Sequence, residues 1–222
     1  MTVKLISYSK GEKDESLQDI IAYTARVSNP SNQDNTETSE RLLRYLIREK
    51  HWSPFEMVSA CLEVTTTRDI ARQLLRHRSF SFQEFSQRYA DPTQDLNFVM
   101  RQARLQDTKN RQNSIELSDM MDSDERIDLE LNWYKEQAEV LNAARKSYEW
   151  AIEKGIAKEQ ARSVLPEGIM ESRLYVNGTI RSWIHYVDLR SGNGTQKEHI
   201  ELARACSAAL EPVFPMIKEF CH

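Results

Sequence analysis

The sequence has few of the residues that support covalently or metal-stabilised folds. Its 222 residues include three cysteines, Cys61, Cys206 and Cys221, which are far apart and odd in number. This spacing predicts neither a disulfide framework nor a Cys-x-x-Cys metal site. No other set of His, Cys and Asp residues has metal-ligand spacing, so we expect no metal. None of the cysteines lies in a position typical of an activated thiolate, so a cysteine nucleophile is not expected either.

Long apolar runs and phosphate-binding glycine loops are also missing. No stretch approaches the roughly 20 apolar residues that a membrane helix needs, so we expect no membrane contact. Residues 1–9 lack the basic flank and apolar core of a signal peptide, which indicates a cytoplasmic protein. The six glycines form no Gly-x-Gly-x-x-Gly or Walker loop, so neither a Rossmann-type flavoprotein nor a P-loop kinase is supported.

Charge is weak overall but uneven along the chain. A net charge of −4 argues against a general nucleic-acid binder. Between residues 68 and 111, however, eight Arg and one Lys face five acidic residues. Arginine is the side chain whose planar fork matches phosphate and carboxylate oxygens in pairs. This region therefore indicates an anion-binding site, although a solvated face can have a similar composition.

Hydrophobic periodicity predicts a helix-rich α+β fold, in one domain over residues 1–222, with a central antiparallel or mixed sheet. Strands are expected over residues 3–8, 57–67, 97–103 and 173–179. Helices are expected over 16–27, 40–50, 68–75, 125–154 and 181–190, with a short one ending at 166. Gly155 is expected to end the long helix, and capping boxes at 16–19 and 195–198 are expected to begin the first and last helices.

The arginine-rich region contains two informative patterns. Arg68, Arg72 and Arg76 are spaced four apart, so a helix would stack them on one face, where like charges await an anion from the protein or a ligand. The following segment, 76–89, holds three Arg, one His, one Glu and three Ser with little periodicity. Loops with many donors and few apolar anchors are often binding loops, so we expect this segment to contact a ligand.

This segment also resembles a known family. Arg-His-Arg, seven intervening residues and Ser, here from Arg76 to Ser86, is similar to the motif of the flavin-dependent thymidylate synthases. The resemblance extends from about residue 25 to residue 198. It includes Ala-Arg-Val-Ser at 25–28, His-Trp-Ser-Pro-Phe-Glu at 51–56, Ala-Arg-Ser-Val-Leu-Pro at 161–166, Arg-Ser-Trp-Ile-His at 181–185, Asp-Leu-Arg at 188–190 and Gln-Lys-Glu at 196–198.

The resemblance implies a dUMP site. The residues that fall where the family grips the nucleotide are Gln73, Arg76, Glu84, Phe85, Ser86, Gln87, Arg88, Arg162 and Arg190. Forked cationic donors and backbone N–H groups are what a phosphate requires. Arg190 falls where the family places a guanidinium against uracil, and there it would stabilise negative charge as the catalytic residue.

The resemblance also implies an FAD site. The residues concerned are Ser53, Arg76, His77, Arg78, Glu84, Thr179, Arg181 and His185, with Glu84 between nucleotide and flavin. They offer polar contacts for the flavin and cations for its pyrophosphate. Three departures from the family pattern affect FAD contacts: Met57 and Gly194 stand where a His is frequent, and Thr179 stands where an Asn is common.

The implied reaction is reductive methylation of dUMP to dTMP, with methylenetetrahydrofolate as carbon donor, NADPH as reductant and FAD as hydride carrier. The family also implies a homotetramer whose active sites lie between subunits. Two alternatives remain open at this point. One is a nucleic-acid-binding module that uses Arg and Phe of residues 76–89, and the other is a folate- and flavin-dependent methylase of uracil in RNA.

Overall fold

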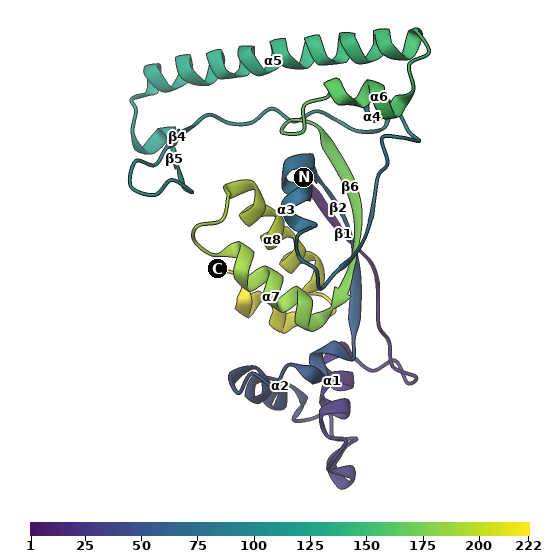
Figure 1. The fold of residues 1–222 in the computed structure, drawn as a ribbon. Coiled ribbons are helices and arrows are strands. Elements are labelled where there is room, and N and C mark those ends of the chain that lie inside the picture. The colour runs from purple at the N-terminus through teal and green to yellow at the C-terminus, as the bar shows by residue number, and fades with distance from the viewer.

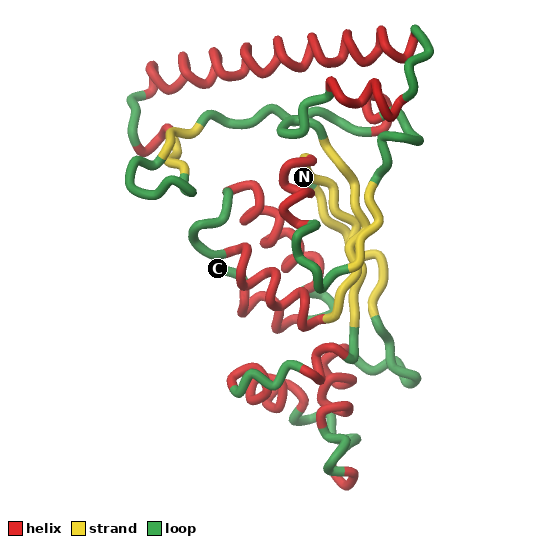
Figure 2. Tube along the Cα trace, viewed as in Figure 1, coloured by secondary structure: helices red, strands yellow, loops and turns green.

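A four-stranded sheet forms the centre of the molecule. In the computed structural model, which describes residues 1–222, its order is β1 (Thr2–Tyr8), β2 (Ser59–Thr67), β6 (Glu171–Thr179) and β3 (Ser81–Glu84). Every neighbouring pair is antiparallel, so the central sheet is antiparallel rather than mixed. The strands run side by side along one edge of the molecule in Figure 2. The prediction of a mixed helix and sheet fold with such a sheet is confirmed.

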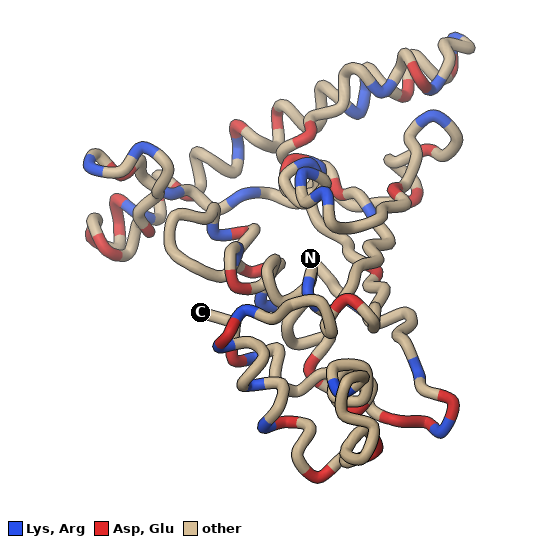
Figure 3. The backbone as a smooth tube through the Cα atoms, turned by 60° about the horizontal axis from the view of Figure 1, so that its bottom comes forward, with Lys and Arg blue, Asp and Glu red and all other residues tan.

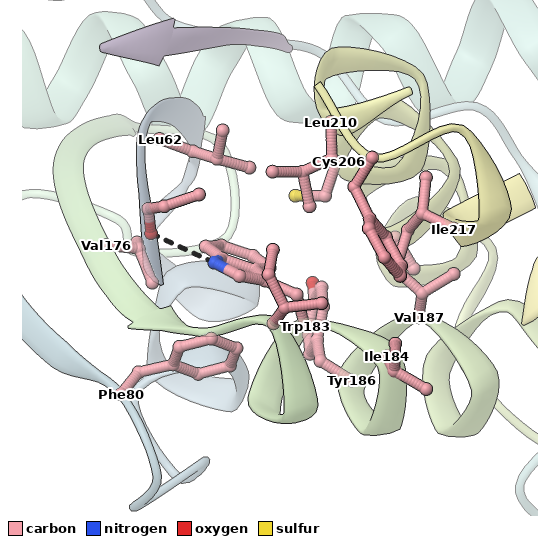
Figure 4. Packing of buried hydrophobic residues seen from close by; sticks show 14 of the residues in the cluster. Leu62, Phe80, Val176, Trp183, Ile184, Tyr186, Val187, Cys206, Leu210 and Ile217 are labelled. Carbon is pink, nitrogen blue, oxygen red and sulfur yellow. Dashed lines mark hydrogen bonds between the residues drawn. The ribbon is translucent and has the colours of Figure 1, made fainter. Parts of the chain in front are cut away.

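Helices α7 (Ile180–Ser191) and α8 (Lys197–Leu210) and the 3-10 helix η5 (Pro215–Phe220) complete the main core. Both helices lie on the same side of the sheet in Figure 1. Alternate residues of β2 are buried, as its period of two predicted. The core cluster contains 28 buried residues, and Trp183 at its centre donates Nε1–H to the carbonyl of Ala60 at 3.0 Å (Figure 4).

A helical layer at one end of the sheet comprises α1 (Leu17–Ala25), α2 (Ser39–Arg48) and the 3-10 helices η1 (Pro30–Asn32) and η2 (Ser53–Glu56). The predicted cap of α1 is confirmed, because Ser16 Oγ accepts the Asp19 amide at 3.2 Å. Arg26 is buried between α1 and α2, where it donates to the Asn35 carbonyl and to Thr38 Oγ1.

The long helix α5 (Ser123–Glu153) lies across the opposite end of the molecule (Figure 1). Asp122 caps its start, and Gly155 takes a positive φ of 76° just beyond its end, as predicted. Its C-terminal part packs on α6 (Lys158–Ala161) and η4 (Arg162–Val164) in a second, small core. None of the helices combines the length and apolar character required to cross a lipid bilayer.

The middle of the chain differs from the prediction. The strand expected over 97–103 is wrong: only Phe98 forms a single bridge, to Met170, and Gln137 of α5 satisfies both backbone groups of Arg101. The elements found there are α4 (Pro92–Asp95), the hairpin β4 (Arg104–Gln106) with β5 (Ser114–Glu116), and η3 (Leu117–Asp119).

The capping box predicted for the last helix is also wrong. No side chain caps α8, and the Thr195 hydroxyl turns back to the Leu189 carbonyl. The Glu198 carboxylate is engaged elsewhere, by Arg104 at 2.6 Å and Arg101 at 3.2 Å. Because both arginines hold this carboxylate, it does not turn back to accept the backbone N–H of Thr195, as a capping box requires.

Candidate active site

The segment 76–89 is anchored more firmly than its composition suggests. Its residues 81–84 form the edge strand β3, which the sequence did not predict. Just before it, Phe80 is buried against Trp183, with ring centroids 4.5 Å apart (Figure 4). Gly178 on the neighbouring strand makes room, since a Cβ there would come within 2.2 Å of the Phe80 ring. The segment therefore has a fixed path on which polar side chains can be held.

Arg190 and His77 meet at one side of this segment. Arg190, in the last turn of α7, donates Nε–H to His77 Nε2 at 2.9 Å. The Tyr186 ring stands edge-on to the His77 ring at 5.0 Å and tilted to the buried His199 ring at 5.8 Å. His199 Nδ1 lies 3.1 Å from Gln73 Oε1. We call Gln73, His77, Tyr186, Arg190 and His199 the histidine cluster.

Both imidazoles of the histidine cluster are held neutral. Burial, followed by the positive charge of Arg190, lowers the pKa of His77 from 6.5 to about 4. Burial, Arg190 and His77 together lower the pKa of His199 to about 3. Arg190 is half-buried, makes no ion pair with a carboxylate, and has only a neutral hydrogen-bond partner. Its charge is therefore available to stabilise a developing anion.

A second group of predicted residues lies around a pocket of about 400 Å³ beside α3 (Arg68–Leu74). We call it the arginine pocket, and its lining residues are Arg68, Arg72, Gln87, Arg162, Ser163, Leu165 and Glu167. Gln87 is buried, with Nε2 3.1 Å from Met170 Sδ. Three guanidinium groups around one polar pocket suit an anionic ligand.

Internal carboxylates already compensate much of this charge. Glu167 pairs with Arg72 and lies 4.0 Å from Arg68. Arg88 pairs with Glu159 at 3.0 Å, and the backbone carbonyl of Glu159 accepts from Arg162 at 3.3 Å. A ligand phosphate would have to exchange with these groups.

The remaining predicted dUMP residues are placed near this pocket. Glu84 accepts from Ser172 Oγ at 2.7 Å and lies 3.5 Å from Arg68 Nη1. The Phe85 amide donates to the Arg173 carbonyl at 2.8 Å, and Ser86 Oγ accepts the Arg88 amide at 3.4 Å. No hydrogen bond joins Ser86 to His77, so the geometry does not support a serine nucleophile activated by that histidine.

The predicted stacking of three arginines is only partly correct. Arg68 and Arg72 share the carboxylate of Glu167, but α3 ends at Leu74 and Arg76 lies beyond it. Asp69 does not neutralise them, because it pairs with Arg101 at 2.7 Å. Glu63, the nearest acidic residue before Arg68 in the sequence, does not neutralise them either, because it pairs with Lys4 at 3.4 Å.

Four of the eight residues predicted for FAD, Ser53, Thr179, Arg181 and His185, come together at a third place, where η2 meets α7. Thr179 caps α7, with its hydroxyl 3.2 Å from the Ser182 amide. Arg181 pairs with Glu56 of η2, and His185 stands edge-on to Trp52 at 4.6 Å. Burial and the charge of Arg181 lower the pKa of His185. Ser53 is exposed on η2 in the same region.

Arg76 and Arg78 are exposed and make no side-chain hydrogen bond or ion pair, unlike Arg88, the third arginine of the segment. Free guanidinium groups, a hydroxyl such as that of Ser53 and a neutral imidazole such as that of His185 are the kinds of group that bind a flavin dinucleotide. Because the Thr179 hydroxyl already caps α7, it has less capacity for a cofactor contact than the amide of an Asn would have.

The predicted nucleotide residues are thus divided within one chain. Gln73 and Arg190 belong to the histidine cluster, whereas Gln87 and Arg162 line the arginine pocket. No hydrogen bond or ion pair directly joins a predicted dUMP residue of one group to one of the other. A single chain presents two partial sites.

Two functional candidates were missed from the sequence. His199 and Tyr186 are both fully buried, and a polar atom of each, His199 Nε2 and the Tyr186 hydroxyl, has no partner. A lone His or Tyr on a helix has no sequence signal that separates it from a packed residue. Burial raises the pKa of Cys206 and of Cys61, so neither of these thiols is activated.

No group of three or more His, Cys, Asp or Glu side chains in residues 1–222 could hold a metal ion.

The fold has a solved counterpart. The UMP/dUMP methylase PolB from Streptomyces cacaoi, solved with 5-Br dUMP, superposes with a TM-score of 0.77 at 25% identity, over 99% of this chain and 93% of that one. The same protein solved with 5-Br UMP gives the same TM-score. The fold is therefore that of a known nucleotide methylase.

Sequence comparisons define the family. The Thy1 model, thymidylate synthase complementing protein, matches residues 4–216. A probable flavin-dependent thymidylate synthase from Paramecium bursaria Chlorella virus 1 is 49% identical over 219 residues, which cover 98% of this chain and 97% of the relative. A flavin-dependent thymidylate synthase from Synechocystis sp. is 48% identical, with the same coverage. The chain belongs to the Thy1 family, and the resemblance found in the sequence is confirmed.

Proposed function

We propose that this protein is a flavin-dependent thymidylate synthase that converts dUMP to dTMP. The observation that carries the proposal is Arg190, a half-buried guanidinium with no carboxylate partner, held by the neutral His77. A cation placed beside uracil stabilises the negative charge that develops on the ring without donating a proton. Cys206 lies close to Tyr186 of this cluster but is fully buried, and burial raises its pKa, so the ring is activated electrostatically rather than by thiolate attack.

FAD is the cofactor of the proposed reaction. When bound, it supplies the hydride that turns the transferred one-carbon unit into a methyl group. Arg76 and Arg78 have free guanidinium groups for its pyrophosphate. Ser53, Arg181 and His185 provide polar contacts where η2 meets α7. Thr179 contributes less, because it caps the helix.

The nucleotide would be held from both partial sites. Arg162 and Gln87 of the arginine pocket, with the neighbouring Arg88, receive the phosphate, which replaces Glu159 as the anionic partner of Arg88. Gln73 and Arg190 of the histidine cluster contact the remainder of dUMP. The two partial sites can contact one dUMP molecule only if they face each other.

A homotetramer would bring them together across a subunit boundary. Three apolar side chains at helical spacing on one face of α5, Ile127, Leu131 and Tyr134, are each about half exposed, at 48%, 52% and 56%. Contiguous exposed apolar surface on a long helix is typical of a protein interface. We propose that this face of α5 is covered by a second copy of the chain, and that the two partial sites of neighbouring copies form one active site.

The overall reaction is dUMP plus methylenetetrahydrofolate plus NADPH and a proton, giving dTMP plus tetrahydrofolate and NADP⁺. One CH₂ unit moves from folate to C5 of uracil, and NADPH provides the hydride that completes the methyl group. Folate is therefore released as tetrahydrofolate. We propose that residues 1–222 act as one domain and that the reaction takes place in the cytoplasm.

The distribution of charge favours a small nucleotide over a nucleic acid. Lys and Arg alternate with Asp and Glu along the backbone in Figure 3. Within the arginine-rich region, Arg72, Arg88 and Arg101 are each paired with a carboxylate. A nucleic-acid groove needs a continuous positive surface, whereas a mononucleotide needs one pocket.

UMP is a second candidate substrate, because the structural relative PolB is a UMP/dUMP methylase. Purified protein should carry a flavin absorption spectrum, and NADPH oxidation in the presence of methylenetetrahydrofolate should depend on dUMP. Parallel reactions with UMP and with a uridine-containing oligoribonucleotide distinguish a dUMP methylase from a UMP methylase and from an RNA methylase. Turnover with dUMP supports the proposal, and turnover only with the oligoribonucleotide contradicts it.

A further inference from the structure

A chain of directed hydrogen bonds runs from a half-buried ion pair to Gln73. It begins at Glu198, whose carboxylate accepts from Arg104 at 2.6 Å and lies 3.2 Å from Arg101. Gln196 donates Nε2–H to Glu198 Oε2 at 2.9 Å. Gln73 in turn donates Nε2–H to Gln196 Oε1 at 2.9 Å. A carboxylate can only accept, so each amide in the chain has one permitted orientation.

The same chain fixes the tautomer of His199. Because Gln73 Oε1 can only accept, His199 must donate from Nδ1, over 3.1 Å. The ring is fully buried, at the start of α8, and the rings of Tyr186 and His77 lie 5.8 and 6.3 Å from it. His199 therefore has neither the space to rotate nor another partner for its Nδ1 proton.

Gln73 is thus held from both sides. Its amide uses one N–H on Gln196 and one oxygen lone pair on His199, which leaves one N–H and one lone pair for a ligand. Without the His199 bond, the amide would lose one of the two contacts that hold it, and its free donor and acceptor would be placed less firmly. Hydrogen-bonded neighbours in a side-chain network restrict one another in this way.

We propose that His199 is a positioning residue of the nucleotide site, which holds the Gln73 amide in the orientation that dUMP requires. The assignment rests on the proposed function, because it takes Gln73 to contact dUMP. His199 itself does not touch the substrate. It acts through Gln73, while Gln196 and Glu198 hold the opposite side of the same amide.

A double-mutant cycle on the FAD-loaded full chain tests this role. His199→Leu removes the donor, and Gln73→Ala removes the group on which it acts. Each should weaken dUMP binding, measured by isothermal titration calorimetry, by about tenfold, the order expected for one lost hydrogen bond. The double variant should bind no more weakly than Gln73→Ala alone. His199→Asn, which can donate from Nδ2, should restore affinity to within about threefold of wild type.

A purely structural role for His199 would lower the unfolding midpoint without this pattern. Independent, additive effects of His199→Leu and Gln73→Ala on the Kd would overturn the proposal, as would wild-type affinity in His199→Leu. Should His199→Leu fail to fold, Gln196→Leu provides the same test from the other side of the amide, and its wild-type affinity for dUMP would be equally contradictory.

The proposed function and the positioning role of His199 can be disproved separately. Wild-type protein that neither binds dUMP nor produces dTMP would remove the proposed function and, with it, the role of His199. Wild-type protein that produces dTMP, together with a Gln73→Ala variant of unchanged dUMP affinity, would remove the role of His199 alone.

Discussion

The histidine cluster and the arginine pocket differ in how far their positive charges are compensated before a ligand binds. In the cluster, the imidazoles of the half-buried His77 and the buried His199 are neutral, and Arg190 keeps an uncompensated charge. In the pocket, Glu167 already pairs with the exposed Arg72, and next to it Arg88 is paired with Glu159. A preorganised, partly dry site gives strong electrostatic stabilisation, whereas exposed ion pairs exchange at little cost. We infer from this difference that the histidine cluster stabilises charge on the reacting ring, whereas the arginine pocket binds the phosphate.

The largest effect is expected where the uncompensated charge lies. Arg190→Lys keeps the charge but loses the planar fork and the bond to His77, so kcat should fall by about 100-fold or more. Arg173→Lys, a matched change at an exposed arginine without an ion pair, should leave kcat unchanged. Steady-state dTMP formation measures both. Normal turnover in Arg190→Lys would show that Arg190 does not have the assigned role of stabilising charge on the uracil ring.

A smaller effect, on affinity rather than on turnover, is expected in the pocket. Arg162→Ala should weaken dUMP binding by about 1.5–3 kcal/mol, the usual contribution of a charge-assisted hydrogen bond. Arg111→Ala, at another exposed arginine, serves as the control. Calorimetric titration with dUMP provides the Kd. Equal affinities in the two variants would remove the pocket from the nucleotide site.

The anchoring of segment 76–89 by Phe80 can be tested through Gly178. A Cβ at this position would meet the Phe80 ring at 2.2 Å, so Gly178→Ala should lower the free energy of unfolding by about 1–3 kcal/mol. Gly168→Ala is the matched control, because a Cβ there has no neighbour within 4 Å. Urea unfolding of both variants distinguishes them. Equal stability would mean that Phe80 moves aside freely.

The smallest effect concerns pH. The pKa values of His77, about 4, and His199, about 3, lie below the ordinary 6.5, so the unfolded chain binds protons that the folded chain excludes. Stability is therefore fully present above pH 6.5 and falls as the pH is lowered towards 5. The slope of the urea midpoint against pH should be shallower in His199→Asn than in His51→Asn, a variant of an exposed histidine. Identical slopes would contradict the neutral-histidine description.

Local patterns predicted local structure well. The alternation in β2, the Ser16 cap and the Gly155 stop all depend on neighbours in sequence, and the structure confirms them. The edge strand β3 was missed because four residues carry almost no periodic signal, and its pairing with β6 connects distant parts of the chain. The strand at 97–103 failed because Gln137 of α5 takes the backbone bonds of Arg101.

In the site too, residues within the sequence motifs were predictable, whereas their partners from distant parts of the chain were not. Arg190, His77 and Gln73 were expected as ligand-binding residues from the family resemblance, and the structure places them together. Their supporting residues were not predictable, because Tyr186 and His199 reach them from separate helices. Likewise, the carboxylates that compensate Arg72 and Arg88, Glu167 and Glu159, lie far from them in sequence.

The most direct test of the account is a single turnover without a cysteine nucleophile. Enzyme in which Cys61, Cys206 and Cys221 are all replaced by Ala is loaded with FAD, reduced by NADPH without oxygen, and mixed with dUMP and methylenetetrahydrofolate. Flavin oxidation is followed by absorbance, and dTMP is quantified after quenching. The account predicts dTMP in an amount equal to the flavin oxidised, as in wild type. Absence of dTMP from the folded, FAD-loaded, dUMP-binding triple variant would contradict it.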